Sequence, residues 1–448
     1  MAEHGFLPLR IEGRLPDDLR GTLVRNGPGL FELFGTRVRH AFMADGGITA
    51  IRLGGGAAAA ACRVTASAGL RAERAAGRAL FGDAVSWPRR VRNLVQGRYK
   101  NTANTSVLAW QGRLLALMEG ARPTELRLTD GDIETVGETD LGVVGAMFSA
   151  HPHRVAAHRT TYNFGLRYGR RPAIVLYALP DEGPARRLGE VELGWNPMLH
   201  DFIATERHLV FFVAPVVLSV PRMMLQLGDF ASLWRWQPRR GTEVIVVPLD
   251  EPSRPTRFTL PAFYQWHFAN AWSPSASEVV VDLVQYPDFA SFEALTGTGD
   301  GAGPVGEELD GQLHRARIEL TARRLVSEPR WDRPCEFPRV HPAREGAAHG
   351  HTWLAGDDLR TIARIDGEGR AEVADLGAAA TVSEPVFVPR AGAGDEAAGW
   401  VLTLCHDRAQ DLSYLAILDG ARPADGPVAR CWLDHPVPIT FHGAWVPA

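Results

Sequence analysis

The chain has 448 residues, of which 45% are hydrophobic and 22% are charged, proportions that are ordinary for a globular protein. Its formal net charge of −4 predicts no nucleic-acid partner, and no run approaches the ~20 apolar residues that span a bilayer. The cysteines form no CxxC pair, which argues against a zinc ribbon, an iron–sulfur cluster or a c-type haem. Unpaired cysteines, and an N-terminus without the pattern of a signal peptide, predict a cytoplasmic protein.

Short strands dominate the predicted elements, and most of them lie in the second half of the chain. Each is an apolar or alternating run bounded by Gly, Pro, Asp or Asn, which is the sequence pattern of a strand. In chain order they cover residues 209–218, 243–249, 277–284, 323–328, 384–389, 399–407 and 412–419. Helical periodicity is rare, and we expect only two short helices, within residues 76–92 and 289–296.

Turn dipeptides recur along the chain and predict tight connections between strands. They are Asn26-Gly27, Asp45-Gly46, Asp130-Gly131, Asp366-Gly367 and Asp419-Gly420. Low-complexity stretches at 54–61, 297–311 and 391–399 are interpreted as surface loops inside one domain that covers residues 1–448. Many short strands predict an all-β sandwich, barrel or propeller, and a single sandwich is too small for this length. The sequence contains no WD or kelch-type repeat, so it does not by itself give the number of blades of a propeller.

Four of the 15 histidines stand in aromatic or apolar runs that resemble buried strands. They are His151 in FSAHP, His200 in NPMLHDFI, His267 in FYQWHFANAW and His442 in ITFHGAW. A buried imidazole has to be hydrogen-bonded or ligated, because an unpaired polar group in the core costs a few kcal/mol. The four are tens of residues apart, which suits a radial β architecture in which each inner strand delivers one side chain to a central axis.

The last strand of the chain contains one of these histidines, His442, and in a propeller such a strand closes the ring. A rival set of metal ligands consists of two HxH pairs, His151 with His153 and His349 with His351. Residues i and i+2 of a strand share a face, as in a cupin-like barrel. Pro152 interrupts the first pair and a glycine interrupts the second, which weakens this alternative.

A series of motifs resembles the carotenoid cleavage oxygenase family over nearly the whole chain. In family order the motifs are GTLVRNGPG, RHAFMADGGITAIRL, ANTSVLAWQGRLLALMEG, FSAHP, MLHDF, WQPRRGTEVIVVP, WHFANAW, EFPRVHP, SEPVFVPR and FHGAW. Each piece is weak alone, but their shared order is specific. The resemblance implies an all-β, seven-bladed β-propeller, with loops and short helices forming a cap over a non-haem Fe(2+) on the axis.

The resemblance also implies roles for individual residues. The four iron-binding histidines of the family fall on His151, His200, His267 and His442, and three carboxylates that support them fall on Glu119, Glu336 and Glu384. Metal-bound histidines normally donate their other N–H to a carboxylate or a carbonyl. Three carboxylates leave one histidine without such a partner, and by analogy it is His151. Thr105 matches a threonine whose methyl group crowds a vacant iron position.

The substrate class follows less directly from the same motifs. The family splits conjugated C=C bonds of carotenoids, apocarotenoids or hydroxystilbenes with O2, and one relative is an isomerohydrolase that uses no O2. The stilbene branch typically has a lysine just before the glutamate of LMEG, and here that position is Met118. Methionine suits an apolar polyene passage. We therefore expect a carotenoid or apocarotenoid, with a stilbene-cleaving dioxygenase as the alternative.

Residues 215–234 form an apolar stretch whose only charges are Arg222 and Asp229. It is interpreted either as core packing or as a patch that contacts a membrane peripherally to collect a lipophilic substrate. The alternative to an enzyme is a metal-free propeller that serves as a binding scaffold. The sequence carries no expectation about the oligomeric state.

Overall fold

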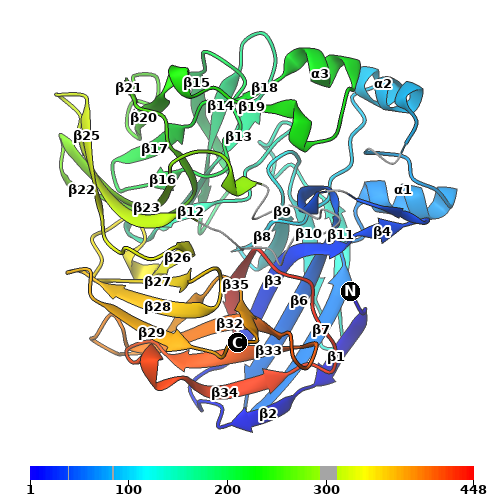
Figure 1. Cartoon of the computed structure of the whole chain (residues 1–448), viewed down its shortest axis with the longest axis vertical. Helices are drawn as coiled ribbons and strands as arrows, with labels where there is room; N and C mark the ends of the chain where they lie inside the picture. Colours follow the sequence, from blue (N-terminus) through cyan, green and yellow to red (C-terminus); the bar gives the residue numbers. More distant parts are fainter. Residues whose placement is uncertain (39, 83–84, 293–309) are drawn as a thin grey trace.

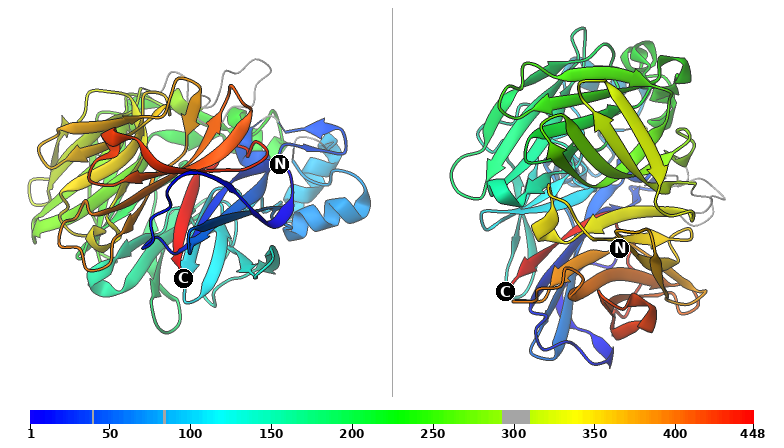
Figure 2. Two further views of the ribbon diagram at one scale, coloured as in Figure 1. Left: turned by 90° about the horizontal axis from the view of Figure 1, so that it is seen from below. Right: turned by 90° about the vertical axis from the view of Figure 1, so that its left-hand side faces the viewer.

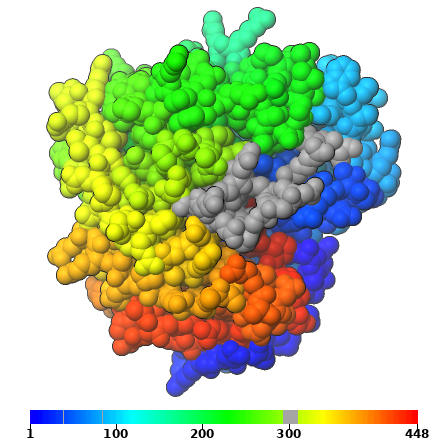
Figure 3. Space-filling model, viewed as in Figure 1, coloured from blue at the N-terminus to red at the C-terminus, as the bar shows by residue number. Residues whose placement is uncertain are grey.

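The computed structural model describes residues 1–38, 40–82, 85–292 and 310–448. Seven sheets of four or more strands surround a common axis, so the expectation of a seven-bladed β-propeller is confirmed (Figure 1). Every ladder within these sheets is antiparallel, and most strands of a blade are joined by short connections, with longer ones between β17 (His208–Val213) and β20 (Thr242–Pro248) and between β23 (Glu278–Tyr286) and β24 (Gln312–Glu319). In the space-filling view the sequence colours follow one another around the ring, since most blades use consecutive segments (Figure 3).

Five blades have four strands each, and their bounds follow in hydrogen-bonded order. One blade runs from β11 (Ile133–Glu138) through β10 (Thr124–Leu128) and β9 (Arg113–Leu117) to β8 (Ser106–Trp110). The next consists of β12 (His153–Val155), β13 (Thr160–Arg167), β14 (Ala173–Pro180) and β15 (Arg186–Glu192). It is followed by β16 (Ile203–Ala204), β17 (His208–Val213), β20 (Thr242–Pro248) and β21 (Thr256–Leu260). The fourth of these blades consists of β22 (Tyr264–Ser275), β23 (Glu278–Tyr286), β24 (Gln312–Glu319) and β25 (Arg324–Pro329). The fifth consists of β26 (Cys335–Val340), β27 (His351–Gly356), β28 (Thr361–Asp366) and β29 (Ala371–Asp375).

The two ends of the chain share the remaining two blades and so close the ring. One contains β30 (Ala380–Val382), β31 (Val386–Pro389), β32 (Gly399–Asp407), β33 (Leu412–Asp419) and β34 (Pro427–Trp432), with β2 (Arg10–Gly13) added beside β34. The other runs from β1 (His4–Pro8) through β7 (Ala57–Val64), β6 (Asp45–Gly54) and β3 (Gly21–Leu30) to β35 (His442–Pro447). The final strand therefore closes the ring, and its ladder lies on one edge, against β3 (Figure 2).

Short helices and two small hairpins lie together at one side of the propeller (Figure 1). The helices are α1 (Ala68–Ala76), α2 (Trp87–Val95) and α3 (Val220–Leu225), and the hairpins are β4 (Glu32–Leu33) with β5 (Thr36–Arg37) and β18 (Val216–Leu218) with β19 (Trp234–Trp236). The expected helix over 76–92 was wrong in its bounds. Gly77 ends α1 in the left-handed conformation, and Ser86 precedes α2, which has Pro88 in its first turn. The second half of the other expected helix, 289–296, lies outside the described residues, as does most of the loop expected at 297–311, while residues 291–292 are helical.

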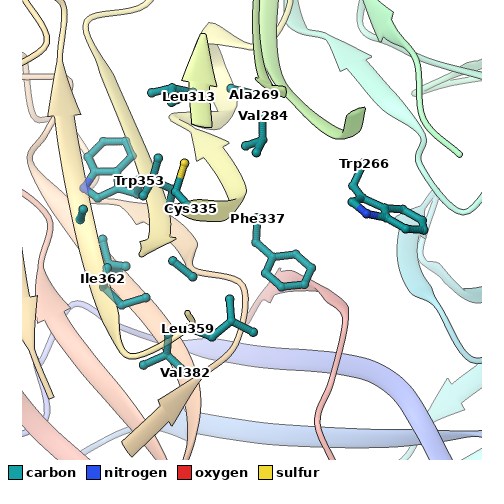
Figure 4. Close-up of a cluster of buried hydrophobic side chains, with 14 of the residues drawn as sticks. Trp266, Ala269, Val284, Leu313, Cys335, Phe337, Trp353, Leu359, Ile362 and Val382 are labelled. Atoms are coloured by element: carbon teal, nitrogen blue, oxygen red, sulfur yellow. The ribbon is translucent and has the colours of Figure 1, made fainter. Parts of the chain in front are cut away.

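The core consists of apolar clusters between neighbouring sheets. Figure 4 shows one cluster, in which Cys335, Trp353 and Ile362 gather on one side while Phe337 and Trp266 lie toward the other. One expectation fails in the core: residues 57–61, interpreted as a surface loop, begin strand β7, and Ala60 and Ala61 are fully buried. Small side chains there let β7 pack between β1 and β6, a tertiary reason that composition does not reveal.

Candidate metal centre

Four blades each deliver one histidine to the axis of the propeller. His151 and His200 lie just before β12 and β16, His267 lies within β22, and His442 begins β35. All four are buried, and one ring nitrogen from each lies within 4.8 Å of the others. The long intervals that separate these histidines in the chain thus correspond to positions at the inner ends of different blades.

Carboxylates fix the orientation of three of the rings. Nδ1 of His200 lies 2.8 Å from Glu119 Oε1, Nδ1 of His267 lies 2.5 Å from Glu336 Oε2, and Nδ1 of His442 lies 2.9 Å from Glu384 Oε1. An ionised carboxylate only accepts hydrogen bonds, so each Nδ1 carries the proton and each Nε2 presents a lone pair.

The ring nitrogens converge, and no donor among the described residues satisfies Nε2 of His151, His200 or His267. Nε2 of His200 and Nε2 of His267 are 3.3 Å apart, although both are acceptors in this tautomer. His151 has no carboxylate partner among the described residues, and its Nε2 is buried without a hydrogen bond. Burial, followed by the neighbouring histidines, lowers the pKa of His151 well below its ordinary value, which favours the neutral form that ligates metals. This donor set fits a divalent transition metal.

The three carboxylates are themselves held from several sides. Glu384 accepts from Arg25 Nη1 at 2.8 Å and from the backbone N–H of Gly443 at 2.9 Å. Burial opposes ionisation of Glu384, but Arg339, His442 and Arg25 outweigh it and hold the pKa of this carboxyl well below its usual range. Arg25 is fully buried, and the sequence analysis missed its role although it stands in the GTLVRNGPG motif.

A backbone irregularity aims Glu336 at its histidine. The register of β26 against β27 shifts between Glu336 and Arg339, and Phe337 has a φ of 55°, the left-handed region that a phenylalanine seldom adopts. Glu336 also accepts from Tyr286 Oη at 2.9 Å and from the N–H of Phe337 at 2.6 Å. The register of β22 shifts on either side of His267 as well. Bulges commonly re-aim side chains beside active sites.

The rival HxH pairs do not form a site. Nε2 of His153 lies 2.8 Å from Asp201 Oδ1, and Nε2 of His349 lies 3.2 Å from Asp282 Oδ2. The partner of His153 in the pair, His151, lies at the axis instead. These two histidines serve buried hydrogen-bond networks between blades.

A small cavity touches the histidines, and a larger one lies beyond it. The small cavity is lined by Thr105, Phe337 and Phe42 together with three of the histidines. The hydroxyl of Thr105 donates to Asn104 Oδ1 at 3.1 Å, which leaves the methyl group as the unengaged part of this side chain. Phe42 also lines the larger cavity, of about 450 Å³, so this side chain lies between the two cavities.

Met118 lines the larger cavity, as a bend after β9 takes it out of the strand. Its sulfur lies 3.3 Å from the hydroxyl of Thr102. Lys100 lines the same cavity, but its ammonium is held by Asp45 at 2.6 Å and Glu73 at 2.7 Å. The ammonium of Lys100 is therefore already paired with protein carboxylates, while Arg37, Arg90 and Arg98 also line this cavity.

Comparisons with known proteins agree with this geometry. The family model described as "Retinal pigment epithelial membrane protein" matches residues 2–447. Apocarotenoid-15,15'-oxygenase of Synechocystis is 29% identical over 97% of this chain and 92% of its own length. Resveratrol cleavage oxygenase 1 of Aspergillus fumigatus is 27% identical over 99% of this chain and 91% of its own length. The crystal structure of cobalt-substituted Synechocystis ACO superposes with a TM-score of 0.89 at 28% identity, covering 99% of this chain and 96% of that one. The chain belongs to the family of the retinal pigment epithelial membrane protein and the carotenoid cleavage oxygenases.

Proposed function

We propose that the protein is a non-haem Fe(II)-dependent dioxygenase that cleaves a conjugated C=C bond of an apocarotenoid or carotenoid into two carbonyl products. One observation carries the proposal: four buried imidazoles converge beside a small cavity, and among the described residues only the side chain of Phe42 is shared between this cavity and a larger, mostly apolar one. When bound there, iron would supply the activation of O2 next to the double bond. His151, His200, His267 and His442 would hold the ion.

The remaining residues of the centre orient the histidine rings and shield the cavity from water. Glu119, Glu336 and Glu384 keep Nδ1 of three histidines protonated, and their charges offset that of a divalent ion in a buried site. Phe42 and Phe337 line the small cavity and exclude water from it. Thr105 narrows the cavity with its methyl group and so limits where a substrate carbon can lie.

The larger cavity favours an apolar polyene over a phenol. Met118 presents a thioether where a stilbene-cleaving enzyme needs a cation, and Lys100 is already paired with Asp45 and Glu73. A phenolate in this cavity would find no unpaired ammonium among these residues. The apocarotenoid substrate of a relative that is 29% identical supports the same choice, whereas the relative named for resveratrol supports the alternative.

Peripheral membrane contact is a further part of the proposal, and the structure narrows the segment involved. Val216 and Leu218 of the stretch 215–234 are buried, so this part of the stretch agrees with the core-packing interpretation. The part from α3 onward differs: Met224 and Leu225 are 57% and 54% exposed. Trp87 of α2 is 53% exposed, and its indole N–H donates to Leu225 O at 2.8 Å. The two helices thus present one apolar surface.

This surface lies beside the larger cavity, which Leu94 of α2 and Gln226 after α3 both line. A lipophilic substrate could therefore pass from a lipid surface to the cavity without crossing water. No helix in the described part of the chain is long and apolar enough to cross a membrane. We also propose a cytoplasmic location, which suits four buried cysteines that are all free thiols.

The test is aerobic incubation of iron-loaded protein with carotenoids, apocarotenals and hydroxystilbenes, followed by identification of products by mass. We expect two carbonyl fragments from an apocarotenal or carotenoid and none in an anaerobic control. Fragments from stilbenes alone would support the alternative substrate. Isomerised but intact substrate would support isomerohydrolase chemistry, and stoichiometric binding without any reaction would support the scaffold hypothesis.

A further inference from the structure

A second group of metal-binding side chains lies on the outer strands of the propeller. His4 of β1 and Cys62 of β7 are directly opposite each other in the ladder that joins these strands. His435 follows β34 of the neighbouring blade. One ligand atom from each of the three residues lies within 4.8 Å of the others. The group is built from the two ends of the chain, since His4 and His435 are 431 positions apart.

The tautomers of the two histidines follow from their backbone partners. Nδ1 of His4 lies 2.8 Å from the carbonyl oxygen of Gly5, and Nδ1 of His435 lies 3.0 Å from the carbonyl oxygen of Pro436. A carbonyl oxygen only accepts, so both Nδ1 atoms carry protons and both Nε2 atoms present lone pairs. These two Nε2 atoms face each other at 2.8 Å. A cation between them, either a shared proton or a metal ion, has to offset the repulsion.

The third side chain favours a metal ion over a proton. Cys62 is fully buried, and within the described part of the chain its sulfur has the hydroxyl of Thr49 as its one hydrogen-bond partner, at 3.6 Å. A buried sulfur beside two imidazole lone pairs is a typical zinc-binding set. Asp434 offers a carboxylate at the solvent side, with its Oδ1 3.9 Å from Nε2 of His435 and its side chain 86% exposed.

We propose that His4, Cys62 and His435 bind one Zn²⁺ ion, with Asp434 or a water molecule in the fourth position. Zn–N bonds of about 2.0–2.1 Å in a tetrahedral site separate two ligand nitrogens by about 3.4 Å. The imidazoles therefore move apart by about half an ångström when the ion enters, which side-chain rotations allow. Such an ion fastens the first strand of one blade to the end of the neighbouring blade, where the ring closes.

Cobalt distinguishes this site from the four histidines, because only this site has a sulfur ligand. Titration of the metal-free full chain with Co²⁺ is expected to produce a thiolate-to-cobalt charge-transfer band in the near ultraviolet. Cys62→Ser and His435→Ala abolish that band, whereas His267→Ala, at the axis, retains it. Cys405→Ser is the matched control, since Cys405 is also buried but lies away from the site, and it retains the band.

Zinc itself provides the second readout. Zn²⁺ is expected to raise the melting temperature of iron-loaded wild type and iron-loaded Cys405→Ser, in which the axial histidines are already occupied, but not of iron-loaded His435→Ala. The absence of a charge-transfer band in wild type, together with an identical zinc response in wild type and Cys62→Ser, would overturn the proposal. The pair of histidines would then share only a proton.

Discussion

Replacing Glu336 by glutamine tests how the carboxylates act on the metal centre. Glu336 accepts three hydrogen bonds, from His267 Nδ1, Tyr286 Oη and the N–H of Phe337. Glutamine has one oxygen and one NH2 group in the same shape. If its oxygen takes the place of Oε2, which accepts from both His267 and the N–H of Phe337, the NH2 group takes the place of Oε1 and donates to the hydroxyl of Tyr286. His267 then keeps its proton at Nδ1 and its lone pair at Nε2, but the buried negative charge that polarises the ring and offsets the charge of the metal ion is lost.

The expected loss of iron affinity follows from the missing charge. Changes of residues that support metal ligands typically cost ~10–100-fold in metal affinity or activity, which corresponds to about 1.4–2.7 kcal/mol. We expect Glu336→Gln to weaken iron binding within that range while the fold remains intact. Competition with a chelator of known affinity measures the change, and far-ultraviolet circular dichroism checks the fold.

Tyr286→Phe is the matched control for this experiment. It removes one neutral donor to Glu336 but leaves the contact between the carboxylate and His267, so the iron affinity should change only a few-fold. An iron affinity of Glu336→Gln within twofold of wild type would contradict this mechanism, because iron binding would then not depend on the charge of Glu336.

Four further results are expected. His267→Ala should lose iron and retain the β signal in circular dichroism; full iron content would mean that the four histidines are not the site. Deleting residues 441–448, from Phe441 onward, removes β35 and should abolish both iron binding and cooperative melting, whereas tolerance of the deletion would contradict ring closure by this strand. Met118→Lys should lower turnover of apolar polyenes at least several-fold relative to 4-hydroxystilbenes, and an unchanged ratio would show that Met118 does not face the substrate. Exchanging Met224 and Leu225 for aspartate should weaken binding to liposomes without changing iron content, and unchanged sedimentation with liposomes would remove the proposed membrane surface.

Sequence patterns predicted the middle strands of the blades well, for a physical reason. The run at 243–249 corresponds to β20 and the run at 277–284 to β23, because such strands are buried on both faces and are continuously apolar. The turns expected at Asp130, Asp366 and Asp419 are also present, each between consecutive strands of a blade. Local composition was sufficient for these elements.

Elements that depend on distant contacts were predicted less well. The dipeptide Asn26-Gly27 reads as a turn but lies inside β3. The side-chain amide of Asn26 donates to the carbonyl oxygens of Ala103 and Ser106, so its role depends on another blade. A side chain at Gly27 would meet the backbone oxygen of Ile439 at 2.6 Å, so the C-terminal segment explains the glycine.

The residues of the candidate site also divide into those that local motifs indicate and those that depend on distant contacts. The histidines and glutamates were found because their motifs resemble those of a family, and Arg25 was not. An arginine within a strand ordinarily faces solvent, and only the fold brings Arg25 to Glu384, 359 positions away. The bulge at Phe337 likewise depends on packing between β26 and β27 rather than on any local signal.

An experiment with labelled oxygen shows whether the protein is a dioxygenase. Iron-loaded protein would be mixed with an apocarotenal under ¹⁸O2. The carbonyl products would be trapped chemically before their oxygen exchanges with water, and their masses would be measured by mass spectrometry. We expect two carbonyl fragments that both carry ¹⁸O, formed by wild type and not by His267→Ala. Intact substrate, or fragments formed equally by His267→Ala, would contradict this expectation.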